Sequence, residues 1–418
     1  MRLFLIALAA FVIGALAALG AYRAVVPFPN DALARANAFE PENRDWFFQN
    51  ASEVFPTRTV ARGGPAQPFE AVEGALDGFT FEYEGRARTL EDMYTDMETA
   101  GLIILHEGRI LHESYGRGAG PGTRFTTFSL VKSFTSTLVG AAVQDGLIGD
   151  VDDPLTKYLP ELEGTAYDGV TIRHAMQMSS GVAFDKEGWP DARDTVEFIT
   201  DTAVIGKRRA FDMAAAYPRA AEPGTKFNYN TAESQILLEL VRRVSGETAA
   251  AYMERKVWRP LGMAHDAGWI LDAPGQDGAE IGGAFFNASL RDWARFGQFI
   301  EQDGVWNGEQ ILPADWVARA TVSDEPHLMH GEVHPNEQRG YAWHWWTIAD
   351  GGFTASGANG QTLYIHQDQD LVVARASAWP EGWVAEYDAQ SLALFRALGE
   401  WLDEPIETAS AEEVVLAE

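Results

Sequence analysis

The chain has no cysteine among its 418 residues. This absence excludes thiol nucleophiles, disulfide bonds, cysteine metal sites and lipid attachment to cysteine. Positive charge is also scarce, because 61 acidic residues outnumber 32 lysines and arginines and give a formal net charge of -29. So acidic a surface argues against nucleic acid or an anionic membrane surface as a partner. We find no internal repeat and expect no cofactor.

The N-terminus carries an uncharged apolar run over residues 3–22, with an arginine on each side. A spanning helix needs about 20 such residues, whereas the core of a signal peptide has about 7–15. We therefore predict that residues 1–25 are a retained membrane anchor. The alternative is a cleaved signal, with Ala15-Leu16-Ala17 read by the peptidase. Either way the rest of the chain is exported, facing the periplasm or the exterior from the membrane, or released there.

Beyond this segment the sequence divides into three predicted parts. Residues 26–75 are rich in Pro, Ala, Asn and Gly without a long periodic run, which is typical of a linker and irregular extension. One domain is expected over residues 76–403. The tail over residues 404–418 is acidic.

Strand patterns lie at both ends of this domain and helix patterns lie between them. Residues 101–116 read as two apolar strands around a Glu107-Gly108 turn, and strand patterns return from residue 340. The middle is mainly helical to about residue 320; the clearest helices of the domain span 234–246, 290–304 and 388–402. We predict an α+β fold of the α/β sandwich type: one antiparallel sheet from both chain ends, flanked by helices, with an inserted helical subdomain. A site is expected at their junction.

A serine and a lysine three residues apart, Ser129 and Lys132, form the most informative motif, S-x-x-K. At this spacing the two side chains lie on one face of a helix, so the lysine amine can reach the serine hydroxyl. N-cap-type residues, Thr126, Thr127 and Ser129 itself, precede a run with helical apolar spacing, which puts Ser129 in the first turn of a buried helix. Free N–H groups there favour developing negative charge. The pair can make a serine nucleophile, although a bare S-x-x-K also marks solvated helix starts.

A Pro-Gly turn opens the second informative stretch, residues 223–231, whose loop can aim Tyr229 into a cleft. A tyrosine hydroxyl can relay a proton if a neighbouring cation lowers its pKa. The alternative is a core aromatic residue whose hydroxyl binds backbone.

The third stretch, residues 355–361, stands at the start of a late strand and contains Ser356 and Gly357. Glycine at such a place lets backbone come close to a ligand. A strand-edge N–H here could complete an oxyanion hole with the N–H of Ser129. The alternative is a simple glycine turn.

In this order the three stretches resemble the serine beta-lactamase-related family, which includes class C beta-lactamases, D-alanyl-D-alanine carboxypeptidases, esterases and nylon-oligomer (6-aminohexanoate-dimer) hydrolases. Ser129 and Lys132 fall on its S-x-x-K, Tyr229 on the tyrosine of Y-x-N, and Gly357 on the glycine of its K-T-G or H-x-G box. The likeness covers about residues 95–400 and looks closest to the nylon-oligomer hydrolases and related esterases. It implies a beta-lactamase/transpeptidase-like fold.

The motif and the resemblance together imply a mechanism. Lys132, kept partly neutral by burial or nearby positive charge, takes the proton of Ser129, which attacks an acyl carbonyl. By resemblance, the N–H groups of Ser129 and Ala358 hold the oxyanion, and Tyr229 passes a proton to the leaving alcohol or amine. Water then hydrolyses the acyl-enzyme. The other candidates for binding at the oxyanion are Gly357, Thr231 and Ser356.

Two positions depart from the family pattern. Thr231 replaces the asparagine of Y-x-N, and Ala355 stands where lactamases and peptidases hold a lysine or histidine that binds the substrate carboxylate. We therefore predict a serine hydrolase for a small-molecule ester or linear amide. The alternatives are a beta-lactamase or D-alanyl-D-alanine carboxypeptidase, and a catalytically idle member that binds peptidoglycan or a protein.

Three other groups of residues give weaker signals. His327, His330 and His334 could hold a metal, but the surrounding Pro and Gly indicate a solvated loop, so we expect no metal site. A strand packed on both faces is expected to contain Trp343, Trp345 and Trp346, one of which could line an acyl pocket. A surface loop that could shape the substrate rim contains Asp185, Glu187 and Trp189.

Overall fold

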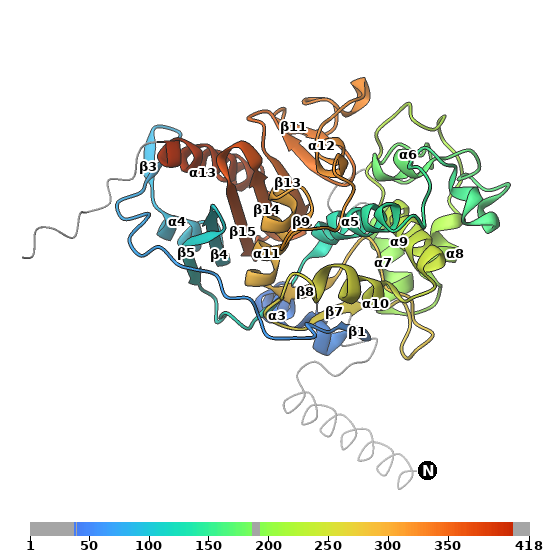
Figure 1. Cartoon of the computed structure of the whole chain (residues 1–418), viewed down its shortest axis with the longest axis horizontal. Coiled ribbons are helices and arrows are strands. Elements are labelled where there is room, and N and C mark those ends of the chain that lie inside the picture. The colour runs from blue at the N-terminus through green and yellow to red at the C-terminus, as the bar shows by residue number, and fades with distance from the viewer. Residues whose placement is uncertain (1–36, 39, 186–192, 404–418) are drawn as a thin grey trace, which may run out of the picture.

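The computed structural model describes residues 37–38, 40–185 and 193–403 (Figure 1). The predicted anchor at residues 1–25 and the acidic tail at 404–418 lie outside this part, as do Glu187 and Trp189 of the predicted rim. Within the described part of the chain, no helix is both long and apolar enough to cross a bilayer.

A seven-stranded antiparallel sheet organises the molecule, in the order β11-β12-β13-β14-β15-β4-β5. Its strands are β4 (Thr99–His106), β5 (Arg109–Tyr115), β11 (Arg339–Tyr341), β12 (Trp346–Ile348), β13 (Phe353–Gly357), β14 (Gln361–His366) and β15 (Leu371–Ser377). Glu107 and Gly108 have φ of 48° and 72°, the geometry of the two-residue turn expected between β4 and β5. The predicted α+β fold, with one antiparallel sheet from both chain ends, is confirmed.

Helices cover both faces of this sheet, because successive side chains of its strands point to opposite sides and both sets are apolar. In β4, Leu102 and Ile104 belong to a core shared with α4 (Leu90–Thr95) and α13 (Ala385–Asp403). Ile103 of the same strand faces the larger core, where α11 (Leu290–Glu301) packs on β4, β14 and β15. The central strands β14, β15 and β4 are therefore buried on both faces.

The predicted helical region lies beside the sheet, with α5 (Val131–Gln144) at the boundary (Figure 1). α5 packs against α9 (Thr231–Ser245) and is buried over most of its length. Gly246, with φ of 69°, is the left-handed C-cap that ends α9. The shorter helices are α6 (Ile172–Met176), α7 (Arg193–Ile199), α8 (Ala210–Ala215), α10 (Ala249–Met253) and α12 (Trp316–Ala320).

The prediction of an irregular extension over residues 26–75 is wrong for residues 44–60, which contain a helix and a strand. α3 (Arg44–Val54) buries Phe47 and Phe48, and β1 (Thr57–Val60) pairs with β7 (Ala267–Ile270). Together with β8 (Phe286–Ser289) and β6 (Arg124–Thr126) these strands form a second sheet in the order β1-β7-β8-β6. Each of its strands has only three or four residues, too few to show a period. The other strands form two small hairpins: β2 (Phe81–Tyr83) with β3 (Arg86–Arg88), and β9 (Val305–Trp306) with β10 (Glu309–Gln310).

The tryptophan-rich segment is also not one strand. Trp343 and Trp345 lie in the bend between β11 and β12, where His344 has φ of 62° and the chain reverses. Both tryptophans are buried in the main core, whereas Trp346 belongs to a separate aromatic cluster. The prediction of a single strand packed on both faces is therefore wrong.

Candidate active site

Ser129 lies in a 3-10 turn, Phe128–Leu130, that runs directly into α5. Phe128 has φ of 44°, a strained conformation for an aromatic residue. Its ring packs against Phe48 and Phe285, with ring centroids 4.9 and 5.6 Å apart. Contacts from α3 and from the segment before β8 therefore hold the turn that presents the serine.

Thr127 stands at the N-cap of this turn as expected, but no side-chain oxygen caps the turn or α5. The Thr127 hydroxyl instead accepts a hydrogen bond from the Phe286 N–H at 3.1 Å, and the Thr127 N–H donates to the Phe286 carbonyl at 2.8 Å. Thr127 thus extends the pairing of β6 with β8 up to the serine.

Lys132 points at the serine hydroxyl and is almost fully enclosed. Its Nζ lies 3.1 Å from Ser129 Oγ, 3.4 Å from Thr231 Oγ1 and 2.5 Å from the Gly283 carbonyl oxygen. None of these partners carries a charge, and burial lowers the pKa of Lys132 to about 7. A large fraction of the amine is therefore neutral at pH 7 and able to accept a proton from Ser129.

Gly283 is a site residue that the sequence analysis missed. A Cβ at this position would come 2.7 Å from Thr231 Cγ2 and 3.3 Å from Lys132 Nζ. Glycine therefore leaves the space that the lysine amine occupies. The only sequence signal was the Gly282-Gly283 pair just before a strand-like run. Thr231, expected at the oxyanion, contacts this same amine.

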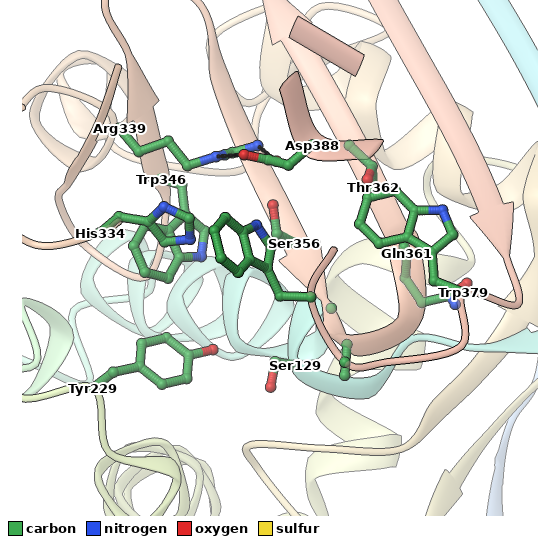
Figure 2. A pocket seen from close by; sticks show the side chains of 15 residues that line it. Ser129, Tyr229, His334, Arg339, Trp346, Ser356, Gln361, Thr362, Trp379 and Asp388 are labelled. Atoms are coloured by element: carbon green, nitrogen blue, oxygen red, sulfur yellow. Dashed lines mark hydrogen bonds and ion pairs between the residues drawn. The ribbon is translucent and has the colours of Figure 1, made fainter. Parts of the chain in front are cut away.

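Tyr229 enters the site from the loop before α9, as expected, and Figure 2 shows its hydroxyl turned toward Ser129. Trp346 stacks on its ring at 5.5 Å. Lys132 Nζ lies over the ring face, 5.0 Å from the centroid. Burial nevertheless raises the pKa of Tyr229, and a hydrogen bond with Ser129 only partly opposes the rise. The hydroxyl therefore stays protonated at neutral pH, where it can donate a proton. The condition named for a proton relay, a pKa lowered by a neighbouring cation, is not met.

The end of β13 comes very close to the serine turn. A Cβ on Gly357 would lie 2.1 Å from the Thr127 carbonyl oxygen, so only glycine fits; the close approach is to the backbone of the serine turn, whereas the sequence suggested an approach to a ligand. Ala358 follows and lines both cavities that meet at Ser129. Its backbone is therefore beside the serine, where the second oxyanion N–H was expected. The Ser356 hydroxyl donates to Thr354 Oγ1 at 3.0 Å and lines one cavity.

Two cavities meet at Ser129. The smaller, which we call the aromatic cavity, has a volume of about 50 Å³ and is lined by Tyr229, Trp346 and Trp383 among others (Figure 2). The larger, which we call the apolar cavity, has a volume of about 580 Å³ and is lined by Phe128 and Phe285 among others. They lie between the sheet side and the helical side of the molecule, the expected junction.

A cation lines the aromatic cavity, but it is not at position 355. Ala355 is 1% exposed, packs in the main core and lines neither cavity. Arg339 of β11 lines the aromatic cavity instead. Its guanidinium donates to Asp388 at 2.6 Å and to Thr354 Oγ1 at 2.9 Å, so its charge is already balanced. No pattern in the sequence indicated this pair, whose members are 49 positions apart.

The three histidines of the candidate metal cluster have separate partners. His327 Nε2 lies 3.0 Å from Ser179 Oγ, and His330 Nε2 lies 3.2 Å from Thr347 Oγ1. The His334 ring packs against Trp346 and Trp383 in the aromatic cavity, where burial lowers its pKa to about 4. Among the described residues, no group of three or more metal-binding side chains is placed to hold an ion.

The family model described as Beta-lactamase matches residues 86–397. The 6-aminohexanoate-dimer hydrolase of Paenarthrobacter ureafaciens is 29% identical over 350 residues, covering 82% of this chain and 86% of that protein. The beta-lactamase of Escherichia coli strain K12 is 26% identical over 200 residues, 46% of this chain and 48% of that protein. A solved structure from Bacillus anthracis, provisionally described as a 6-aminohexanoate-dimer hydrolase, has the same fold, with a TM-score of 0.79 at 22% identity over 91% of this chain and 98% of its own.

Proposed function

The chain belongs to the beta-lactamase family of serine hydrolases and has that family's fold, and we propose that it cleaves an ester or linear amide through an acyl-enzyme on Ser129. The observation that carries the proposal is the 3.1 Å contact between Ser129 Oγ and Lys132 Nζ, an amine whose pKa burial lowers to about 7. A base and a nucleophile are thus already in contact.

The chemistry follows from this geometry. Lys132 takes the Ser129 proton while Oγ forms a bond to the acyl carbon, and the negative charge on the carbonyl oxygen faces the N–H groups of Ser129 and Ala358. The bond from the acyl carbon to the leaving oxygen or nitrogen then breaks, and Tyr229 hands a proton to that atom and is reprotonated from Lys132. Water attacks the ester on Ser129 by the same path, which releases the acid and restores the serine.

The substrate class follows from the charges around the serine. Arg339, a cation that lines the aromatic cavity, is paired with Asp388, and the net charge of -29 repels anions. Neutral esters and linear amides therefore fit better than beta-lactams, which carry a carboxylate. The likeness to a 6-aminohexanoate-dimer hydrolase supports a linear amide or a related ester.

A reactivity panel tests this proposal. The purified chain should hydrolyse a short neutral ester or a linear amide with a kcat/KM well above that for a chromogenic cephalosporin, and Ser129→Ala should abolish the reaction while the chain stays folded. Faster hydrolysis of the cephalosporin would favour a beta-lactamase. A folded wild-type chain that cleaves neither the ester, nor the amide, nor the cephalosporin would favour the alternative of a catalytically idle family member that binds peptidoglycan or a protein.

We also propose that the chain is exported and retained at the membrane by residues 1–25, which rests on the apolar run at residues 3–22.

A further inference from the structure

The two cavities at Ser129 differ in size and chemistry. The apolar cavity is more than ten times larger than the aromatic cavity, about 580 against 50 Å³. Phe48, Phe128 and Phe285 line its inner part, and Ile199 and Val196 line the side formed by α7. Its charged lining residues among those described are Arg44, which pairs with Glu98 at 2.7 Å, and Glu381. A mainly apolar space of this kind can take a hydrocarbon group.

The aromatic cavity offers polar groups in a small space. Ser356 lines it, and so does Trp383, whose indole N–H is buried without a hydrogen-bond partner among the described residues. A buried donor without a partner costs free energy until a ligand accepts its hydrogen bond. At 50 Å³ the cavity has room for only a few non-hydrogen atoms, since one water takes about 10–15 Å³ by the same measure.

The position of Tyr229 indicates which part of the substrate enters each cavity. It lines the aromatic cavity and does not line the apolar one. Because its protonated hydroxyl must meet the departing oxygen or nitrogen, the leaving group belongs on the aromatic side. The acyl group then extends from the carbonyl carbon into the apolar cavity.

We propose that the substrate combines a long, apolar acyl group with a small, polar leaving alcohol or amine. This inference rests on the proposed acyl-enzyme at Ser129 and specifies its substrate. Each methylene buried in the apolar cavity should raise kcat/KM by up to about fourfold.

Two isomeric esters distinguish the two sides of the carbonyl. Methyl decanoate places its long chain on the acyl side, and nonyl acetate places it on the alcohol side, with the same atoms in both. The purified chain should hydrolyse methyl decanoate with a kcat/KM at least about tenfold higher, measured below the solubility limit of each ester. Equal rates, or a preference for nonyl acetate, would overturn the inference.

A substitution at the mouth of the apolar cavity gives the second test. Val196 is 50% exposed, so Val196→Trp fills the cavity mouth without disturbing the core, and it should lower the ratio of decanoate to acetate kcat/KM by about tenfold for methyl esters. Val322→Trp is the matched control, because Val322 is 57% exposed and lines neither cavity. An unchanged ratio in Val196→Trp would contradict the assignment.

A fluorophosphonate separates failure of the inference from failure of the proposed function. Labelling at Ser129 together with no acyl-chain preference would overturn the inference alone. No labelling and no ester hydrolysis by the folded chain would overturn the acyl-enzyme, and the inference with it.

Discussion

At the scale of single residues, Lys132 is the group on which the account depends. An amine buried against uncharged partners is costly in its protonated form, and the same burial makes it a base at neutral pH. The lysine therefore makes both the catalytic rate and the stability of the fold increase with pH, in adjacent pH ranges.

The first prediction concerns the pH dependence of activity. Because only the neutral amine accepts the Ser129 proton, kcat/KM should rise about tenfold per pH unit below pH 7 and level off above it, following the Lys132 pKa of about 7. Hydrolysis of a neutral ester across this range measures the profile, with chemical hydrolysis subtracted. A rate independent of pH between 5 and 8 would show that another group is the base.

The second prediction concerns stability. Burial lowers the pKa of Lys132 in the folded chain from its ordinary value of 10.5 to about 7. The unfolded chain therefore binds more protons between pH 7 and 10.5, and the free energy of unfolding should rise with pH in that window. Lys132→Met keeps the volume and removes the charge. It should raise Tm at pH 7 and lower kcat by about 100-fold or more.

The control is Lys207→Met, because the Lys207 side chain is 64% exposed. Its effect on Tm and kcat should be small. A Lys132→Met variant that melts below wild type, or that retains more than about a tenth of the activity, would contradict the role of the buried amine.

At the scale of elements, the site depends on two backbone segments that approach closely: the 3-10 turn before α5 and the end of β13. The sequence predicted the first because Ser129 and Lys132 are neighbours on one helix, so their spacing alone reports their contact. It predicted Tyr229 and Gly357 only through their likeness to family motifs. Gly283, and Arg339 with Asp388, could not be predicted, because long-range packing brings them to the site.

The same reasoning explains the elements that were missed. β4, β5, β14 and β15 have six to eight residues, which is long enough for the sequence to show them as strands. β1, β6, β7 and β8 have three or four residues, and their pairing depends on partners far along the chain. α3 buries phenylalanines in a segment whose composition indicated an irregular extension.

The third prediction tests the close approach of β13. Gly357→Ala would place a Cβ 2.1 Å from a backbone oxygen, so β13 and the serine turn must separate. Displacement of the oxyanion edge should lower kcat by about 100-fold, with a smaller effect on Tm. Gly120→Ala is the control, since a Cβ there meets nothing within 4 Å. A Gly357→Ala variant with the wild-type kcat would show that the position of β13 does not affect the reaction.

At the scale of the whole molecule, the chain from α3 onward is one folded unit. α3 buries Phe47, Phe48 and Val54 in the main core, and Phe48 also lines the apolar cavity. Residues 1–25 lie outside the described structure.

The fourth prediction follows from this division. Deletion of residues 1–25 should give a soluble enzyme with full activity. Deletion of residues 1–56 also removes α3. The loss of two buried phenylalanines alone should lower the free energy of unfolding by about 6–10 kcal/mol, which is as large as the stability of a typical domain. This variant should therefore not fold. Circular dichroism and ester hydrolysis compare the two. A folded, active 1–56 deletion would show that α3 is dispensable, and full-length protein in the aqueous fraction after lysis without detergent would rule out the anchor.

Identification of the acylated residue tests the central claim most directly. The chain is mixed with a fluorophosphonate, or with an ester and then acid-quenched, and digested with trypsin, which cuts after Arg124 and Lys132. Mass spectrometry should find the adduct in the peptide of residues 125–132, on Ser129 rather than on Thr126 or Thr127. No adduct should form in Ser129→Ala. A stoichiometric adduct on another residue, or turnover of an ester without any adduct on Ser129, would contradict the account.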